Sequence, residues 1–136
     1  MPRDRSLPPP PALLAEAGAA ILAASLAVRL VPFRTLAERL GKGAKGKGAA
    51  DVETAYWLRR AVLAWANRLP WRTLCFEQGL AAVALLRRRR LAATLYYGAA
   101  TIDDELKAHV WVTSGETELV GGESKDNYGV LARFGS

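Results

Sequence analysis

The fold class is decided by LAATLYYG, residues 91–98, and AHVWVT, residues 108–113, because both stretches have the composition of β-strands. Ser114-Gly115 is a turn signal, and TELV, residues 117–120, is expected to return antiparallel to the second strand. Most of the sequence between residues 12 and 90 carries helical patterns. Helices followed by a small antiparallel sheet predict an α+β fold, with the N-terminal helices packed on the sheet.

The helical region divides at proline and at a capping residue. Apolar residues from Ala12 to about Leu40 suit one or two helices, with a break at Val31-Pro32 because proline disfavours the α conformation in the residue before it. Asp51 is expected to cap a second helical segment that ends before Pro70. A further helix follows, and Thr73 is its expected cap.

Length and composition indicate one domain. The chain has 136 residues, of which 51% are hydrophobic, and this is enough for a single packed core. Pro8 to Pro11 form an unbroken proline run, so residues 1–11 are expected to be a flexible, extended arm. Residues 12–136 are expected to form the domain.

Basic residues are concentrated in the first 100 positions, which carry sixteen basic and six acidic side chains, whereas residues 101–136 carry three and seven. GKGAKGKG, residues 41–48, is expected to be a solvated loop, and Arg87 to Arg90 a helix end where cations suit the dipole. A non-catalytic basic scaffold that binds nucleic acid or an anionic surface is the alternative. Because no helix-turn-helix or RNP-like motif accompanies the basic runs, nucleic acid is not the expected partner.

Several classes of protein are excluded by composition. Cys75 is the only cysteine and His109 the only histidine, so neither an internal disulfide nor a structural zinc site with four Cys/His ligands can form. The apolar stretch Ala17 to Val28 is shorter than the roughly 20 residues of a membrane span, and no signal peptide is evident. We therefore expect a cytoplasmic protein without stable membrane insertion.

Cys75 and His109 form a candidate catalytic pair. A helix beginning just after Thr73 puts Cys75 in its first turn, where backbone N–H groups and the positive dipole end favour a thiolate. His109, near the start of the second predicted strand, could fold back onto that helix start. A cysteine nucleophile, a base and N–H groups for the oxyanion are the parts that acyl transfer needs. An isolated core cysteine and a structural histidine remain the alternative.

The sequence around this pair resembles a known protein family. Four segments, in this order, resemble the transglutaminase-like cysteine peptidases of lasso peptide biosynthesis: LPWRTLCFEQGLAA (69–82), LLRRRRLAATLYYG (85–98), AHVWV (108–112) and YGVLARF (128–134). The resemblance covers roughly residues 13–134. It implies a transglutaminase-like or papain-like core, Cys75 as the nucleophile and His109 as the base. It implies no metal and no cofactor.

The resemblance also implies partners. Such peptidases remove the leader from a ribosomally made lasso precursor, together with a small leader-recognition protein, and an ATP-dependent cyclase uses the product. Because no recognition domain precedes residue 50, the free-standing form is expected. Residues 12–70 would then dock the partner and leader, and residues 71–136 would form the catalytic part.

The third catalytic position departs from the family pattern. The family has an acidic residue about a dozen positions after the histidine, where this chain has Gly121. Counting back across the predicted turn brings Glu123 close to His109 and leaves Asp126 further off. Glu123 is therefore the expected orienting residue, and Asp126, a backbone carbonyl or a solvated Glu123 remain alternatives.

Aromatic and amide side chains near the pair have two interpretations each. Trp111 should share the sheet face of His109 and could shield the catalytic groups or pack in the core. Gln78 lies three residues after Cys75, where it could reach the substrate or form ordinary helix surface. Trp57, Trp65 and Trp71 are expected to pack the core rather than line a peptide groove. Hydrolysis and aminolysis use the same Cys and His, so sequence leaves both reactions open.

Overall fold

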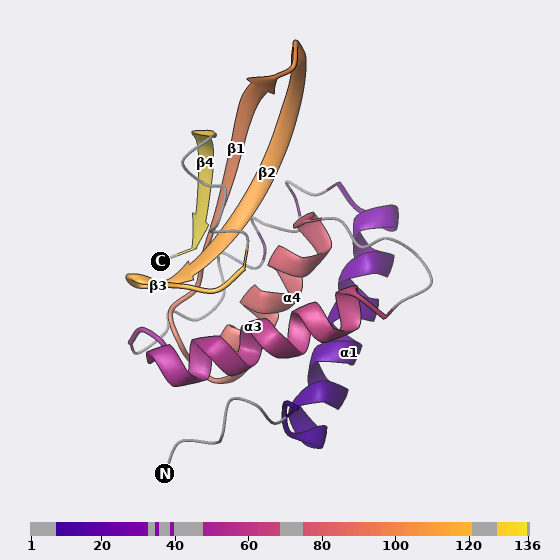
Figure 1. The fold of residues 1–136 in the computed structure, drawn as a ribbon, viewed down its shortest axis with the longest axis vertical. Helices are drawn as coiled ribbons and strands as arrows, with labels where there is room; N and C mark the ends of the chain where they lie inside the picture. Colours follow the sequence, from indigo (N-terminus) through magenta and orange to yellow (C-terminus); the bar gives the residue numbers. More distant parts are fainter. Residues whose placement is uncertain are drawn as a thin grey trace.

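The computed structural model describes residues 8–32, 35, 39, 48–68, 75–120 and 128–135. Within these ranges three helices and a four-stranded antiparallel sheet form an α+β fold, which confirms the predicted class (Figure 1). The elements are α1 (Pro11–Leu30), α3 (Val52–Ala66), α4 (Cys75–Arg88), β1 (Thr94–Ile102), β2 (Glu105–Ser114), β3 (Thr117–Glu118) and β4 (Gly129–Gly135).

Helix boundaries follow local chemistry. At the start of α3, the N–H of Thr54 donates to the Asp51 carboxylate at 2.6 Å, so the predicted cap is confirmed. α1 ends at Leu30, immediately before Val31-Pro32, as the proline signal predicts. Its first residue is Pro11, one position inside the predicted arm, because proline suits the first turn of a helix. Thr73, the predicted cap of α4, lies outside the described residues.

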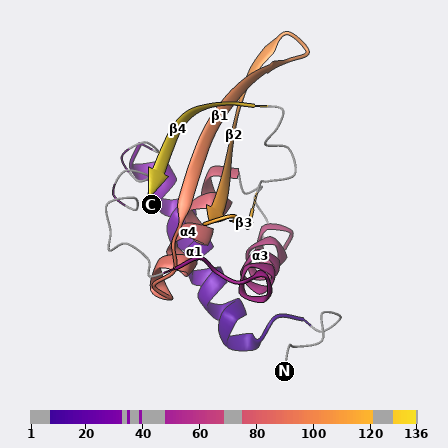
Figure 2. The same cartoon turned by 90° about the vertical axis from the view of Figure 1, so that its left-hand side faces the viewer.

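The strands run in the order β3-β2-β1-β4. β1 and β2 form a hairpin from Thr94↔Thr113 to Ile102↔Glu105, and its distal end projects past the helices (Figures 1 and 2). Asp103 and Asp104 make its turn with φ of 51° and 64°, the left-handed pair that a two-residue hairpin turn needs. Thr113↔Glu118 confirms the antiparallel return, although β3 covers only Thr117–Glu118 of the predicted 117–120.

The strand predictions are wrong in three respects. β1 begins at Thr94 rather than residue 91, and both hairpin strands extend well beyond the predicted ranges. β4 was not predicted, although its residues carry part of the family resemblance. These strands depend on pairing across the sheet more than on their own composition, since cross-strand contacts dominate strand stability.

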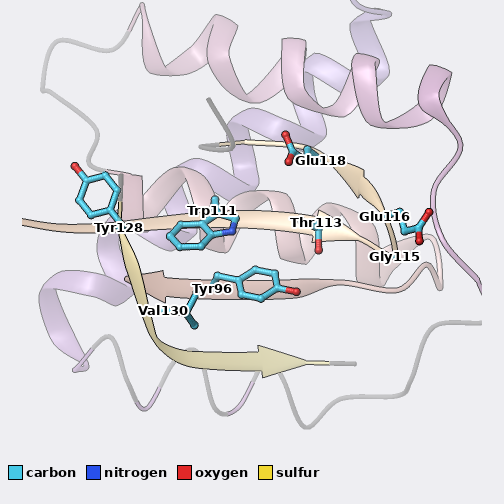
Figure 3. A pocket seen from close by; sticks show the side chains of 8 residues that line it. All are labelled: Tyr96, Trp111, Thr113, Gly115, Glu116, Glu118, Tyr128 and Val130. Atoms are coloured by element: carbon cyan, nitrogen blue, oxygen red, sulfur yellow. The ribbon is translucent and has the colours of Figure 1, made fainter. Parts of the chain in front are cut away.

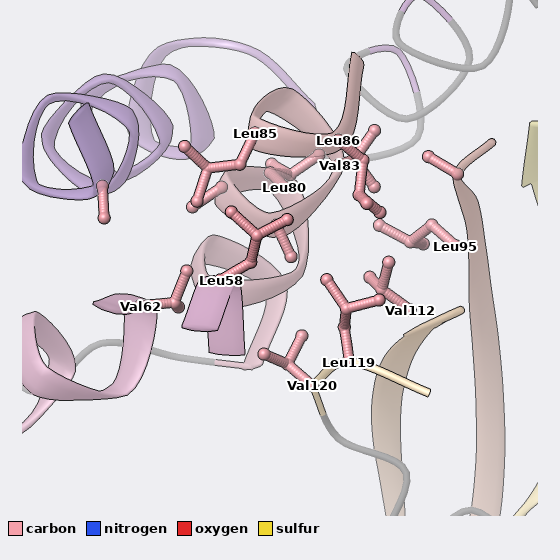
Figure 4. Close-up of a cluster of buried hydrophobic side chains, with 14 of the residues drawn as sticks. Leu58, Val62, Leu80, Val83, Leu85, Leu86, Leu95, Val112, Leu119 and Val120 are labelled. Carbon is pink, nitrogen blue, oxygen red and sulfur yellow. The ribbon is translucent and has the colours of Figure 1, made fainter. Parts of the chain in front are cut away.

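The core lies between the helices and one face of the sheet (Figure 4). α4 contacts β2 directly, and α1 packs on α4 from the other side. A Cβ at Gly79 would lie 3.2 Å from Val110 Cγ2, so the glycine allows α4 to approach β2 closely. The largest fully buried apolar side chains come from every layer: Ile21, Leu58, Val62, Leu85, Leu86, Val110 and Val112.

α1 is a 20-residue apolar helix that also belongs to this core. By length and mean hydropathy it is able to cross a membrane, so the shorter stretch counted from the sequence does not exclude a span. In the fold, however, the Trp65 indole N–H donates to Leu14 O at 2.6 Å, which joins α3 to α1. Trp65 and the 8%-exposed Trp57 thus pack in the helical layer as predicted, and Trp71 lies outside the described residues.

Part of the arginine run also joins two helices. Arg89 donates to both carboxylate oxygens of Glu16, at 3.0 and 2.5 Å, and Arg88 Nε lies 3.3 Å from the same carboxylate. The hydrogen bond from Arg89 and the positive charges of Arg89 and Arg88 hold the pKa of Glu16 below its usual range. These two arginines therefore help to join α4 to α1. Residues 41–47 of the basic loop lie outside the described residues.

Candidate active site

Cys75 is the first residue of α4. The helix start is placed by its neighbour Phe76, whose ring stacks on Tyr97 of β1 with 6.0 Å between centroids. Tyr97 pairs with Val110, the residue after His109 on β2. The backbone of Cys75, the first described residue of α4, therefore lies beside the part of the hairpin that carries His109. The Cys75 side chain lies outside the described part of the structure.

His109 lies on β2 opposite Gly98 of β1. Its neighbour Val110 and the next alternate residue Val112 face the helices and belong to the core. Because side chains alternate along a strand, His109 and Trp111 face away from α4. The imidazole is half-buried, with its centroid 6.0 Å from that of Trp111 and 5.0 Å from that of Tyr128.

The described residues thus bring His109 together with two aromatic rings. They bring the start of α4 to the same region of the hairpin on its other face. The expectation that the imidazole of His109 faces the start of α4 is therefore wrong, because alternate residues of β2 place it on the opposite face of the sheet. The catalytic pairing of Cys75 with His109 stays a prediction. Glu123 and Asp126, the candidates for orienting the imidazole, lie outside the described residues.

Trp111 fulfils the prediction that it shares the face of His109. It is only 4% exposed, and its ring stacks on Tyr96 with 5.5 Å between centroids and 8° between planes. Tyr96 is also its partner in the β1–β2 register. A Cβ at Gly98 would meet the Trp111 ring at 3.0 Å, so the glycine leaves room for the indole. Gln78 is half-buried on α4, and whether it meets substrate stays a prediction.

A cavity of about 590 Å³ opens on this aromatic face (Figure 3). Its aromatic wall combines Trp111 of β2, Tyr96 of β1 and Tyr128, the residue before β4. Its lining is Tyr96, Trp111, Thr113, Gly115, Glu116, Glu118, Tyr128 and Val130. Sequence reasoning missed Tyr96 and Tyr128. The hairpin register could have found Tyr96, whereas Tyr128 needs the pairing of β4.

Glu77 is a third residue that sequence reasoning missed. It lies in the first turn of α4, is 4% exposed and accepts a hydrogen bond from Ser25 Oγ of α1 at 2.8 Å. A carboxylate in the first turn suits the positive end of the helix dipole. The bond joins the start of α4 to α1 two residues after Cys75, and therefore helps to fix where that start lies.

Within the described part of the chain, no three His, Cys, Asp or Glu side chains are grouped as a metal ion would require. Comparison with known proteins gives one result: the family profile described as Transglutaminase-like superfamily matches residues 18–133. No curated protein and no solved structure matches the chain. The match spans α1 through β4 and includes both Cys75 and His109.

Proposed function

The chain belongs to the transglutaminase-like superfamily, and on this basis we propose that it is a cysteine endopeptidase that removes the leader from a ribosomally made lasso precursor. Members of this superfamily are generally cysteine peptidases or transglutaminases. The observation that carries the proposal is the position of Cys75 as the first residue of α4, inside a family match that also includes the HVW segment at His109.

Local geometry supports a nucleophilic role for Cys75. The start of a helix lowers the pKa of a thiol because the dipole and free N–H groups stabilise the thiolate. Three contacts determine where the start of α4 lies: Phe76 on Tyr97, Glu77 on Ser25, and Gly79 against Val110. A helix held at several points can keep its first residue in place during a reaction.

The proposed reaction has two acyl-transfer steps. The Cys75 sulfur bonds to the scissile carbonyl carbon, and its proton passes to His109. The tetrahedral oxyanion is held by N–H groups at the start of α4. As the C–N bond breaks, His109 returns the proton to the leaving amine, and a thioester remains on Cys75. Water then hydrolyses the thioester with His109 as base, and Glu123 orients the imidazole.

The proposed peptidase acts with a partner. A separate leader-recognition protein binds the leader, residues 12–70 dock that complex, and residues 71–136 cut the peptide. The product carries the new amino terminus that the ATP-dependent cyclase requires. We expect the isolated chain to cleave poorly, because the leader is then not held near Cys75.

Mass spectrometry tests this function. A candidate precursor is incubated with this protein and its recognition partner, beside a Cys75→Ala control. The proposal predicts one leader-sized cut with the wild type and a loss of at least about a thousandfold with the variant. A cut at a comparable rate with Cys75→Ala would remove Cys75 from the mechanism.

Two further arms separate related activities. Added alkylamine would increase the mass of the leader fragment if the thioester reacts with amines rather than water. Salt-sensitive, sequence-independent DNA binding without any cleavage would instead support the basic scaffold. Equally fast cleavage without the recognition protein would contradict the proposed dependence on a partner.

A further inference from the structure

We propose that the cavity on the aromatic face of the sheet is a binding site for a cationic peptide side chain, the ammonium of lysine or the guanidinium of arginine. The inference rests on the proposed function only in placing that side chain on the peptide to be cut. The cavity itself is formed by β1, β2, β3 and residues 128–130 (Figure 3).

The aromatic wall supplies one half of the recognition. Tyr96 and Trp111 stack nearly parallel, and Tyr128 stands at the other side of the indole in the view of Figure 3. The faces of such rings carry partial negative charge and attract cations within about 6 Å. Trp111 is 4% exposed and stacks on Tyr96, so it holds the wall in one orientation. The half-buried rings of Tyr96 and Tyr128 offer the accessible surface to a cation.

Carboxylates supply the other half. Glu116 and Glu118 lie at the end of the cavity away from Tyr128 (Figure 3). Among the described residues that line the cavity, none is cationic. Arg133, which pairs with Tyr96 in the β1–β4 register, is the nearest basic residue along that strand pair and is not part of the lining. The local negative charge agrees with the net acidity of residues 101–136 in a chain of net charge +6.

Size and position fit a side chain of a peptide. A volume of about 590 Å³ accommodates an extended lysine or arginine side chain with part of its backbone. Two lining residues, Trp111 and Tyr128, also contact the imidazole of His109. A cation bound among them therefore lies beside His109, on the face of the sheet opposite α4.

Binding is measured on the full-length Cys75→Ala variant, so that no cleavage interferes. The probe is acetyl-Gly-Lys-Gly-amide, compared with the norleucine peptide, which keeps the carbon chain and lacks the charge. Titration is followed by the ¹⁵N signals of the four Trp indoles, with Trp111 assigned through Trp111→Phe. We expect the Trp111 signal to shift with the lysine peptide, and the norleucine peptide to bind about ten-fold more weakly.

Matched variants localise the site. The double variant Glu116→Gln/Glu118→Gln should weaken lysine-peptide binding about ten-fold. The control, Asp103→Asn/Asp104→Asn, changes the net charge equally but at the distant hairpin turn, and lysine-peptide binding should stay unchanged. Tyr128→Leu should weaken binding, and Tyr128→Phe, which keeps the ring face, should preserve it.

Three results would overturn the site. They are equal binding of the norleucine peptide, wild-type affinity in the double glutamine variant, and putrescine binding as tightly as the peptide, which would assign the cavity to free amines. Binding in the Cys75→Ala protein is independent of turnover. If the peptide binds and no precursor is cut, the peptidase proposal fails while the cationic site stands.

Discussion

The two faces of β2 contact different parts of the molecule. Val110 and Val112 face α4 and are almost completely buried among apolar side chains. His109, Trp111 and Thr113 face the other way, where His109 contacts aromatic rings and the other two line the cavity. One side of β2 therefore contributes apolar side chains to the core, and the other side presents polar and aromatic side chains to the cavity and its surroundings.

This difference shows how a small domain can separate stability from chemistry. The period of two along a strand assigns successive residues to opposite environments, so one segment of sequence serves both. The helix-facing side holds α4, whose first residue is the candidate nucleophile. The aromatic side holds the candidate base and the cavity. Substitutions on the two sides should therefore affect different measurements.

Leu95→Ala should have the largest effect on stability. Leu95 is 2% exposed on β1, opposite Val112, and its truncation leaves a cavity in the core. We expect a loss of about 3 kcal/mol in the free energy of unfolding, measured with urea. The same change at Leu106, which is 79% exposed on β2, should cost less than about 1 kcal/mol. Equal losses at both positions would show that the helix-facing side does not form the core.

Gly98→Ala should disturb the aromatic side. The added Cβ would lie 2.9 Å from the Gly129 carbonyl and 3.0 Å from the Trp111 ring, so the indole must move. We expect a loss of about 2 kcal/mol and a reduced near-ultraviolet circular dichroism signal from Trp111. Gly129→Ala is the control, because its Cβ meets nothing nearer than 3.8 Å. An unchanged near-ultraviolet spectrum would mean that the indole is not held over Gly98.

Glu16→Gln should have the smallest effect of the three. Glu16 is 16% exposed and accepts from Arg89, so the substitution should cost about 1 kcal/mol at neutral pH. Because this ion pair lowers the folded-state pKa of Glu16, its contribution exists above the ordinary carboxylate range near pH 4.3 and is lost as the pH falls through the lowered folded-state pKa. Urea unfolding of both proteins from pH 7 downward should therefore converge. A constant difference would contradict the ionic explanation.

Local signals predicted the helical half well. The helix cap at Asp51 requires only the Asp51 carboxylate and the N–H of Thr54, three residues later. The end of α1 requires only that Pro32 disfavours the helical conformation of the residue before it. The sheet was harder because its strands depend on partners that are distant in sequence. GAATIDD and ELK lack strong strand composition, and β4 pairs with β1 some thirty residues earlier.

The candidate site divides in the same way. The shared face of His109 and Trp111 was predictable, because a period of two needs no knowledge of the fold. The cavity was not, since Tyr128 reaches His109 only through the pairing of β4 with β1. Glu77 was missed because a charged residue near a helix start usually faces solvent, whereas here Ser25 of α1 covers it.

The pairing of Cys75 with His109 is the central claim, and the reactivity of the thiol tests it most directly. Cys75 is the only cysteine, so alkylation by iodoacetamide reports on it alone in the native protein. The rate is measured from pH 5 to pH 10 for the wild type and for His109→Gln, with circular dichroism to verify folding. We predict a wild-type inflection well below about 8.5, the value of a free thiol, and a shift toward that value in the variant. Superimposable profiles for the two folded proteins would show that the imidazole does not act on the thiol, and would contradict the proposed mechanism.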